Sequence, residues 1–307
     1  MAIYSIRDLE KLSGIKAHTI RAWEQRYNII EPQRTQTNIR YYQDDDLKKI
    51  LNIALLNKNG IKISKIAKMS DREIIQKVSA ISEVNFEFDT QLDALTISMI
   101  DMDEYKFDRI LSMNLQKMGF ERTMLEVLLP FLDKVSLLWL TGSVQPVQEN
   151  FISYLIRQKI IVAINSEPFA LGENVKKFIL YLPEGETQEL SLLFLQYLLK
   201  SRRNQVVYIG KEIGINDLKA AVNIHKPDFI YTIITETLIN NGVRKYAEQL
   251  KSSFQDCHIL MSGYQIITQN IQSERQITVL KSLDQTIQFI DNLQAERSNG
   301  KTNTYYS

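Results

Sequence analysis

The strongest constraint on the fold is a regular alternation of apolar, β-rich runs with amphipathic helical segments between residues 176 and 296. Five runs have the composition of buried strands, at 178–182, 205–209, 229–234, 258–261 and 277–280. Helical patterns separate them, at about 186–201, 214–224, 240–253, 264–272 and 284–295. Strands that alternate with helices pair in parallel and are covered on both faces. We therefore expect a flavodoxin-like, doubly wound parallel sheet as an α/β domain over 175–296.

The middle of the chain, residues 71–170, is almost free of Gly and Pro and has helical periodicity throughout. It predicts helices at about 87–100, 103–118, 121–141 and 145–165. Four helices with short connections most simply form an antiparallel bundle, which we assign to residues 76–170. The polar end of the chain, 297–307, is expected to be a disordered tail.

The first 72 residues form a third stretch, distinguished by its charge. The whole chain carries a net charge of +1, but residues 1–70 contain thirteen Lys and Arg against seven Asp and Glu. A basic head on a mildly acidic body favours a polyanionic partner at one end only.

Within this head, a short helix ends at Gly14 and a second helix follows at once over about Lys16–Tyr27. Apolar positions from both helices can form one small core, which we expect to include Trp23. A helix, a Gly turn and a basic second helix are the arrangement that places a helix in the DNA major groove. The extended segment Pro32–Tyr42 suits a β-hairpin wing whose arginines bind phosphates.

These residues, in this order and spacing, closely resemble the winged helix-turn-helix domain of the MerR family of bacterial regulators. The resemblance covers residues 3 to about 70. It rests on Arg21–Tyr27, the Pro32 to Thr35 entry, the Arg40–Tyr42 wing and the Asn59-Gly60 turn. It implies a DNA-binding transcription regulator. The expected DNA-binding residues are Lys16, His18, Thr19, Arg21, Arg26, Tyr27, Arg34, Thr35, Asn38, Arg40 and Tyr41.

The order of head, helical bundle and α/β domain also resembles the light-sensing, cobalamin-dependent MerR-type repressors. In that family a Trp, nine intervening residues and Glu-His pack over the adenosyl group of the cofactor. Here Trp139 is followed at the same spacing by Glu149 and Asn150, so the His of the motif is replaced. Trp139 as an ordinary bundle core residue is the open alternative.

The family also places Asp/Glu-x-His-x-x-Gly after the first strand of the α/β domain, and that His ligates cobalt. The corresponding positions here are Glu186, Gln188 and Ser191. An amide oxygen is a much poorer cobalt ligand than imidazole. Thr235, or Thr232, and Gly263 stand near the positions that the family uses for the nucleotide tail. His18, His225 and His258 are the three histidines of the chain, and none falls at the cobalt-ligand position.

We therefore expect a regulator whose C-terminal effector and oligomerisation module has lost His-ligated cobalamin binding. Two alternatives stay open: a working adenosylcobalamin photoreceptor repressor, with cobalamin bound without a protein ligand, and a corrinoid carrier or methyl-transfer module. No P-loop or Cys–His pair indicates an enzyme, and no metal site is expected.

The remaining expectations concern partners and compartment. Cys257 is the single cysteine, which excludes an intrachain disulfide and a cysteine zinc site. The amino-terminal residues lack the apolar core of a signal peptide, and the longest apolar stretch is too short and too charged to cross a bilayer. We expect a cytoplasmic protein with no membrane partner, which binds double-stranded promoter DNA as a homo-oligomer, because MerR-type heads bind inverted repeats. RNA polymerase or another protein is a further candidate partner.

Overall fold

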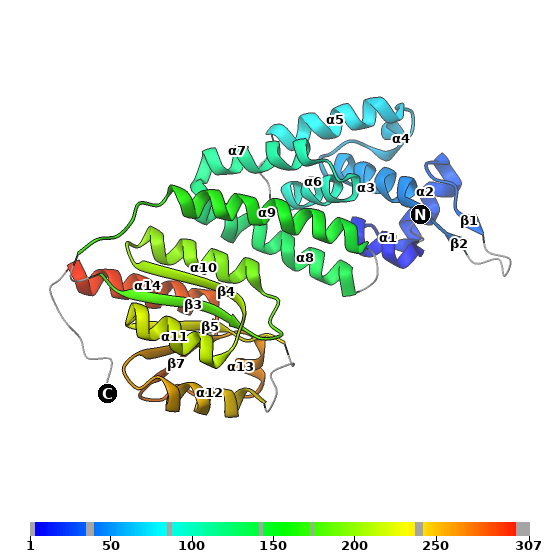
Figure 1. Cartoon of the computed structure of the whole chain (residues 1–307). Coiled ribbons are helices and arrows are strands. Elements are labelled where there is room, and N and C mark those ends of the chain that lie inside the picture. Colours follow the sequence, from blue (N-terminus) through cyan, green and yellow to red (C-terminus); the bar gives the residue numbers. More distant parts are fainter. Residues whose placement is uncertain are drawn as a thin grey trace. The chain divides into compact units, whose positions relative to one another are not determined.

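A computed structural model of the chain describes residues 4–34, 40–84, 88–140, 144–172, 175–236 and 242–298. The chain divides into two compact units, Met1–Ile156 and Arg157–Ser307, which are described separately (Figure 1). The expected disordered tail lies outside the described residues from 299 onward.

The first unit begins with a small helical domain that carries a two-stranded hairpin. Its elements are α1 (Ile6–Ser13), α2 (Ala17–Tyr27), β1 (Gln33–Arg34), β2 (Arg40–Tyr41), α3 (Asp44–Lys58) and α4 (Ile63–Ile66). The backbone amides of residues 5 and 8 are capped reciprocally by the side chains of Ser5 and Asp8, which fixes the start of α1. Gly14 ends α1 with φ 71°, a left-handed conformation that glycine adopts without strain. The helix–turn–helix and hairpin expected from the sequence are therefore present.

Five further helices are described in the first unit, and a wide π-helical turn joins two of them. They are α5 (Asp71–Val84), α6 (Phe88–Asp101), α7 (Glu104–Thr123), α8 (Leu129–Leu140), which follows the π-helical turn η1 (Met124–Leu128), and α9 (Pro146–Ser166), which continues into the second unit. The helices expected from periodicity correspond to α6, α7, η1 with α8, and α9. Helix α5, which was not among them, crosses the boundary expected between head and bundle.

Two residues explain the irregular path between α7 and α8. Gly119 interrupts the helix with φ 78° and ψ 173°, at the break that the sequence indicates. Pro130 has no N–H to donate to the preceding turn. The chain widens there into a π-turn, in which the Leu129 N–H reaches the Met124 carbonyl.

The second unit is built on a parallel five-stranded sheet. The strands are β3 (Lys177–Pro183), β4 (Gln205–Ile213), β5 (Phe229–Ile233), β6 (His258–Ser262) and β7 (Ile277–Leu280), in the order β4-β3-β5-β6-β7. The helices between and after them are α10 (Glu189–Ser201), α11 (Ile215–His225), α12 (Gly242–Ser253), α13 (Tyr264–Thr268) and α14 (Leu283–Ser298). Every neighbouring pair is parallel, and the order reverses beside β3. The flavodoxin-like prediction is thus confirmed.

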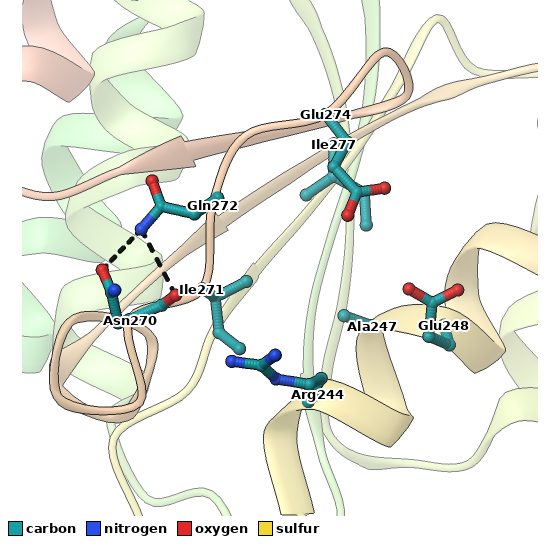
Figure 2. Close-up of a pocket in the computed structure, with 8 residues that line it drawn as sticks. All are labelled: Arg244, Ala247, Glu248, Asn270, Ile271, Gln272, Glu274 and Ile277. Carbon is teal, nitrogen blue, oxygen red and sulfur yellow. Dashed lines mark hydrogen bonds between the residues drawn. The ribbon is translucent and has the colours of Figure 1, made fainter.

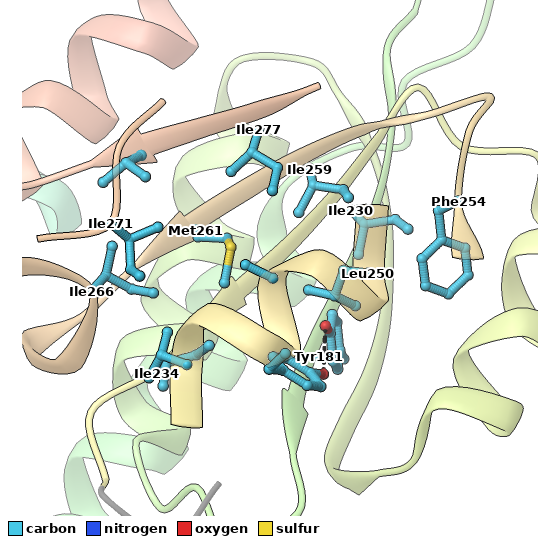
Figure 3. Packing of buried hydrophobic residues seen from close by; sticks show 14 of the residues in the cluster. Tyr181, Ile230, Ile234, Leu250, Phe254, Ile259, Met261, Ile266, Ile271 and Ile277 are labelled. Atoms are coloured by element: carbon cyan, nitrogen blue, oxygen red, sulfur yellow. Dashed lines mark hydrogen bonds between the residues drawn. The ribbon is translucent and has the colours of Figure 1, made fainter. Parts of the chain in front are cut away.

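Helices cover both faces of this sheet. Residues of α11, α12 and α13 pack on one face, where Leu250 and Ile266 meet the inward residues of the strands (Figure 3). Leu218 of α11 belongs to the same buried cluster. Helices α10 and α14 contact the strands and each other on the other face (Figure 1). The hydroxyls of Tyr181 and Tyr246 are 2.9 Å apart inside the first layer, so two buried polar groups satisfy each other. This layering leaves the loops at the carboxyl ends of the strands as the natural ligand edge.

Among the described residues, no helix has the length and apolar character needed to cross a membrane.

Candidate nucleic-acid interface and effector site

The second helix of the head is held by its buried side. Leu9, Leu12 and Ile20 are fully buried between α1 and α2, and Trp23 is buried beside them, as expected. Glu24 also faces inward, where its carboxylate accepts a 2.6 Å hydrogen bond from the Tyr42 hydroxyl. Burial and the neighbouring Glu24 carboxylate raise the pKa of Tyr42 far above its ordinary value, so this phenol stays a donor. The contact ties α2 to the residue that follows the wing.

The start of α2 is capped by α1 rather than by its own preceding residue. The Glu10 carboxylate accepts the Ala17 N–H at 3.1 Å and pairs with the Lys16 ammonium at 3.2 Å. These contacts lower the pKa of Glu10, and the hydrogen bond from the Ala17 N–H has the largest effect. The sequence analysis did not predict this role for Glu10. The available signal was that the residue before α2, Lys16, has no side chain able to cap the helix, while a glutamate lies seven residues before its first residue. Glu10 thereby sets the direction in which α2 leaves the turn.

The opposite side of α2 faces solvent and is basic. Lys16, His18, Arg21 and Arg26 are exposed, and Thr19 and Tyr27 are partly exposed. The six predicted contact residues of this segment, Lys16 before α2 and five within it, are therefore all accessible at least in part. That is the arrangement a major-groove helix requires.

The wing adds two arginines. β1 and β2 pair antiparallel, with Arg34 directly opposite Arg40. β2 is extended by Tyr42, whose backbone exchanges two 2.9 Å hydrogen bonds with Tyr4. Tyr41 and Arg40 are partly buried, and the Arg40 Nε has no hydrogen-bond partner among the described residues. The predicted contacts Thr35 and Asn38 lie outside the described residues.

In the second unit, Glu186 lies at the carboxyl end of β3 and is almost completely buried. Its two oxygens accept the backbone N–H groups of Thr235 and Glu236 at 3.0 to 3.2 Å. Burial raises the pKa of Glu186, and the two N–H donors oppose that shift. Glu186 therefore holds the loop after β3 to the loop after β5, and its carboxylate is engaged by backbone.

The other predicted ligand residues of this unit lie around the same edge. Gln188 precedes α10 and is partly exposed, Ser191 is exposed in the first turn of α10, and Thr235 donates its N–H to Glu186. Gly263, at the start of α13, has φ 112°. A Cβ there would lie 2.3 Å from the Ile234 carbonyl oxygen, so close backbone packing alone requires this glycine.

The predicted bundle residues lie at the ends of two successive helices of the first unit. Trp139 is the penultimate residue of α8 and is 46% exposed, which argues against its being an ordinary core residue. Glu149, in the first turn of α9, accepts a 2.8 Å hydrogen bond from the Ser153 hydroxyl, and Asn150 is exposed.

The donor atoms present at the carboxyl edge do not fit a cobalt ion held by imidazole. Gln188, at the position that the resemblance assigns to the ligand, has an amide side chain, and Glu186 is occupied by backbone amides. His225 ends α11 and His258 begins β6, so both lie at the amino ends of the strands. Burial lowers the pKa of His258, whose Nε2 is 2.7 Å from the Thr278 hydroxyl. No group of three or more His, Cys, Asp or Glu positioned to hold a metal occurs in the part of the chain that the structure describes.

A pocket lies beside α12 in the same unit, and none of the predicted ligand residues is among those that line it (Figure 2). Arg244 and Glu248 of α12 line one side, and Asn270, Gln272 and Glu274 of the segment before β7 line the other. It holds about 200 Å³, which is below the roughly 300 Å³ at which typical small-molecule sites begin. This pocket is too small for a corrin ring.

Comparisons with known proteins assign domains to these regions. Residues 4–73 match the family described as MerR HTH family regulatory protein, so the head is a MerR-type helix-turn-helix domain. Residues 91–163 match the family described as B12 binding domain, and this match covers α6 to α9.

Named relatives are transcription regulators. The HTH-type transcriptional repressor CarH of Myxococcus xanthus is 26% identical over 74% of this chain and 77% of its own length. The HTH-type transcriptional regulator MlrA of Escherichia coli is 36% identical over 24% of this chain and 30% of its own length. The monomethylamine corrinoid protein of Methanosarcina barkeri aligns with 72% of this chain and 99% of its own length, with a TM-score of 0.52 and 11% identity, which shows a shared fold.

Proposed function

Since the chain carries a MerR-type helix-turn-helix domain joined to a B12 binding domain, we propose that it is a cytoplasmic, sequence-specific DNA-binding regulator that works as a homo-oligomer. The observation that carries this proposal is the accessible basic side of α2 beside a wing in which Arg34 and Arg40 face each other. Phosphate contacts from the wing supply affinity, while side chains of α2 read base edges. RNA polymerase is a partner that such a regulator would meet at a promoter.

Duplex binding tests this proposal directly. Full-length protein is used to select duplexes from a randomised library, and its affinity for the selected sequence is compared with that for random duplex at fixed salt. We expect a preference of at least about a thousandfold. Equal affinity for both duplexes would exclude sequence-specific regulation. Light scattering of the protein on the selected duplex should give at least two chains per site, because MerR-type heads read inverted repeats.

We further propose that the effector half does not hold cobalt through a histidine. The engaged Glu186 carboxylate and the amide at Gln188 support this. When bound, cobalamin would supply light-sensitive cobalt–carbon chemistry, which is the alternative that the relatives make worth testing. Protein is mixed with adenosylcobalamin in the dark and desalted, and its absorbance is recorded. No retained corrin is the expected result. Retained corrin with a protein nitrogen on cobalt contradicts the proposal, and retained corrin with its own base on cobalt favours a photoreceptor without a protein ligand.

A further inference from the structure

Asp93 is a buried carboxylate in the middle of α6. Its side chain is 7% exposed, and each oxygen accepts one ammonium group: Lys58 Nζ at 2.6 Å on Oδ2 and Lys134 Nζ at 3.0 Å on Oδ1. A carboxylate removed from water is strongly destabilising unless charged partners satisfy it. The position of Asp93 therefore depends on both lysines.

The two lysines come from different parts of the first unit. Lys58 is the last residue of α3, inside the MerR-type domain, whereas Lys134 lies in α8, five residues before the exposed Trp139. The Lys58 Nζ also lies beside the turn that precedes α2, where a Cβ on Gly14 would be 3.9 Å from it. Ion pairs thus link α8 to Asp93 and Asp93 to Lys58, the Lys58 ammonium lies near the turn between α1 and α2, and α3 itself packs against α1.

A second ion pair between α3 and α6 provides a comparison. Lys48 Nζ is 3.1 Å from Asp101, and both side chains are about one third exposed. Solvent screens such a pair, and exposed pairs of this kind contribute little. Asp93 differs because it is buried and because two helices share it.

We propose that Asp93 is a positioning residue that couples the placement of α8 to the placement of α2, and so to DNA binding. When α8 moves and Lys134 leaves, Lys58 is the lysine that remains on the buried carboxylate, and Lys58 lies near the helix–turn–helix turn. A ligand or partner that covers Trp139 would supply the movement. The inference rests on the proposed function, because its output is affinity for DNA.

A double-mutant cycle tests the coupling. Lys58→Met and Lys134→Met each leave Asp93 one cation, so each should change affinity for the selected duplex only a few-fold. The double variant leaves the carboxylate with neither lysine, and its loss should exceed the product of the single losses by about tenfold or more. In an Asp93→Asn background this excess should vanish. The proposal would be overturned if the loss of affinity in the double variant equals the product of the two single losses, both with Asp93 present and in the Asp93→Asn background.

Hydrogen exchange gives a second readout that does not need DNA. In Lys134→Met, the amides of α2 should exchange several-fold faster than in the parent protein, although the substitution is in α8. Asp133→Asn, an exposed neighbour on the same helix, is the matched control and should leave α2 unchanged. If the amide exchange rates of α2 do not change in Lys134→Met, the coupling is refuted. It is also refuted if the amides of α5 exchange faster by the same factor, because that would indicate general destabilisation. If the protein binds DNA without sequence preference, the proposed function is wrong. The hydrogen-exchange experiment still tests the coupling between α8 and α2, because it needs no DNA.

Discussion

Arg34 and Arg40 lie directly opposite each other across the hairpin of β1 and β2. Like charges at facing positions of an antiparallel pair are mutually repulsive. The arrangement becomes favourable when phosphate groups lie against the pair, since each arginine neutralises one phosphate and releases counterions. This pairing therefore indicates a wing suited to a polyanion.

For Arg40→Ala, we expect affinity to fall similarly on selected and random duplex, because a phosphate contact carries no sequence information. The slope of log K against log salt should decrease in magnitude by about one. Fluorescence anisotropy at several salt concentrations measures both quantities. A loss confined to the selected duplex would instead place Arg40 on a base.

Arg21→Ala should behave differently, because Arg21 is exposed on the accessible side of α2. Loss of a base contact costs about 1–3 kcal/mol of discrimination. Affinity for the selected duplex should fall by that amount and affinity for random duplex should change much less. If both duplexes lose equally, the assignment of base reading to Arg21 is wrong.

Tyr42→Phe should lower the free energy of unfolding of the first unit by about 1–3 kcal/mol. The substitution removes the hydroxyl that Glu24 accepts and leaves the buried carboxylate without this donor. Urea unfolding measures the change. The neighbouring Tyr41→Phe, at a partly exposed position, is the control and should change stability by less than about 0.5 kcal/mol.

Gly263→Ala should destabilise the second unit by on the order of 2–4 kcal/mol. The new Cβ would meet the Ile234 carbonyl oxygen at 2.3 Å, in a backbone conformation with φ 112°. Gly60→Ala provides a control in the head, because its φ is 86° and nothing lies within 4 Å of the added Cβ. The control should cost on the order of 1 kcal/mol from backbone conformation alone. Similar losses for both variants would mean that the close approach is relieved by a small shift.

Alkaline pH should weaken the second unit through Tyr246. Burial raises the pKa of Tyr246 to about 12, whereas a tyrosine in the unfolded chain titrates near 10. Between these values the folded protein holds a proton that the unfolded chain releases, so stability is fully present below pH 10 and falls as pH rises towards 12. Tyr246→Phe should reduce the slope of unfolding free energy against pH in this interval by up to one proton. An unchanged slope would show that Tyr246 does not contribute.

Local patterns predicted most of the fold. Hydrophobic periodicity identified the strands and their intervening helices, and the alternation of the two implied a parallel sheet with helices on both faces. Gly14 marked a turn, and Gly119 lies in the gap between the helices predicted at 103–118 and 121–141. Both have positive φ, which glycine adopts without strain. Periodicity did not separate α5 as a helix of its own. The basic side of α2 was also predictable from the sequence, because buried and exposed positions alternate along an amphipathic helix with its period of 3.6 residues.

Local sequence was enough to predict the strands, most of the helices, their order, and the MerR-type character of the head. These properties depend on residues close together along the chain. Which charged side chains are buried, and which groups satisfy them, follows from the folded arrangement alone. Glu24 meets a phenol 18 positions away, Asp93 meets lysines 35 and 41 positions away, and Glu186 meets a backbone amide 49 positions away. No local pattern encodes such partners, since they are brought together only when the core closes and removes each carboxylate from water.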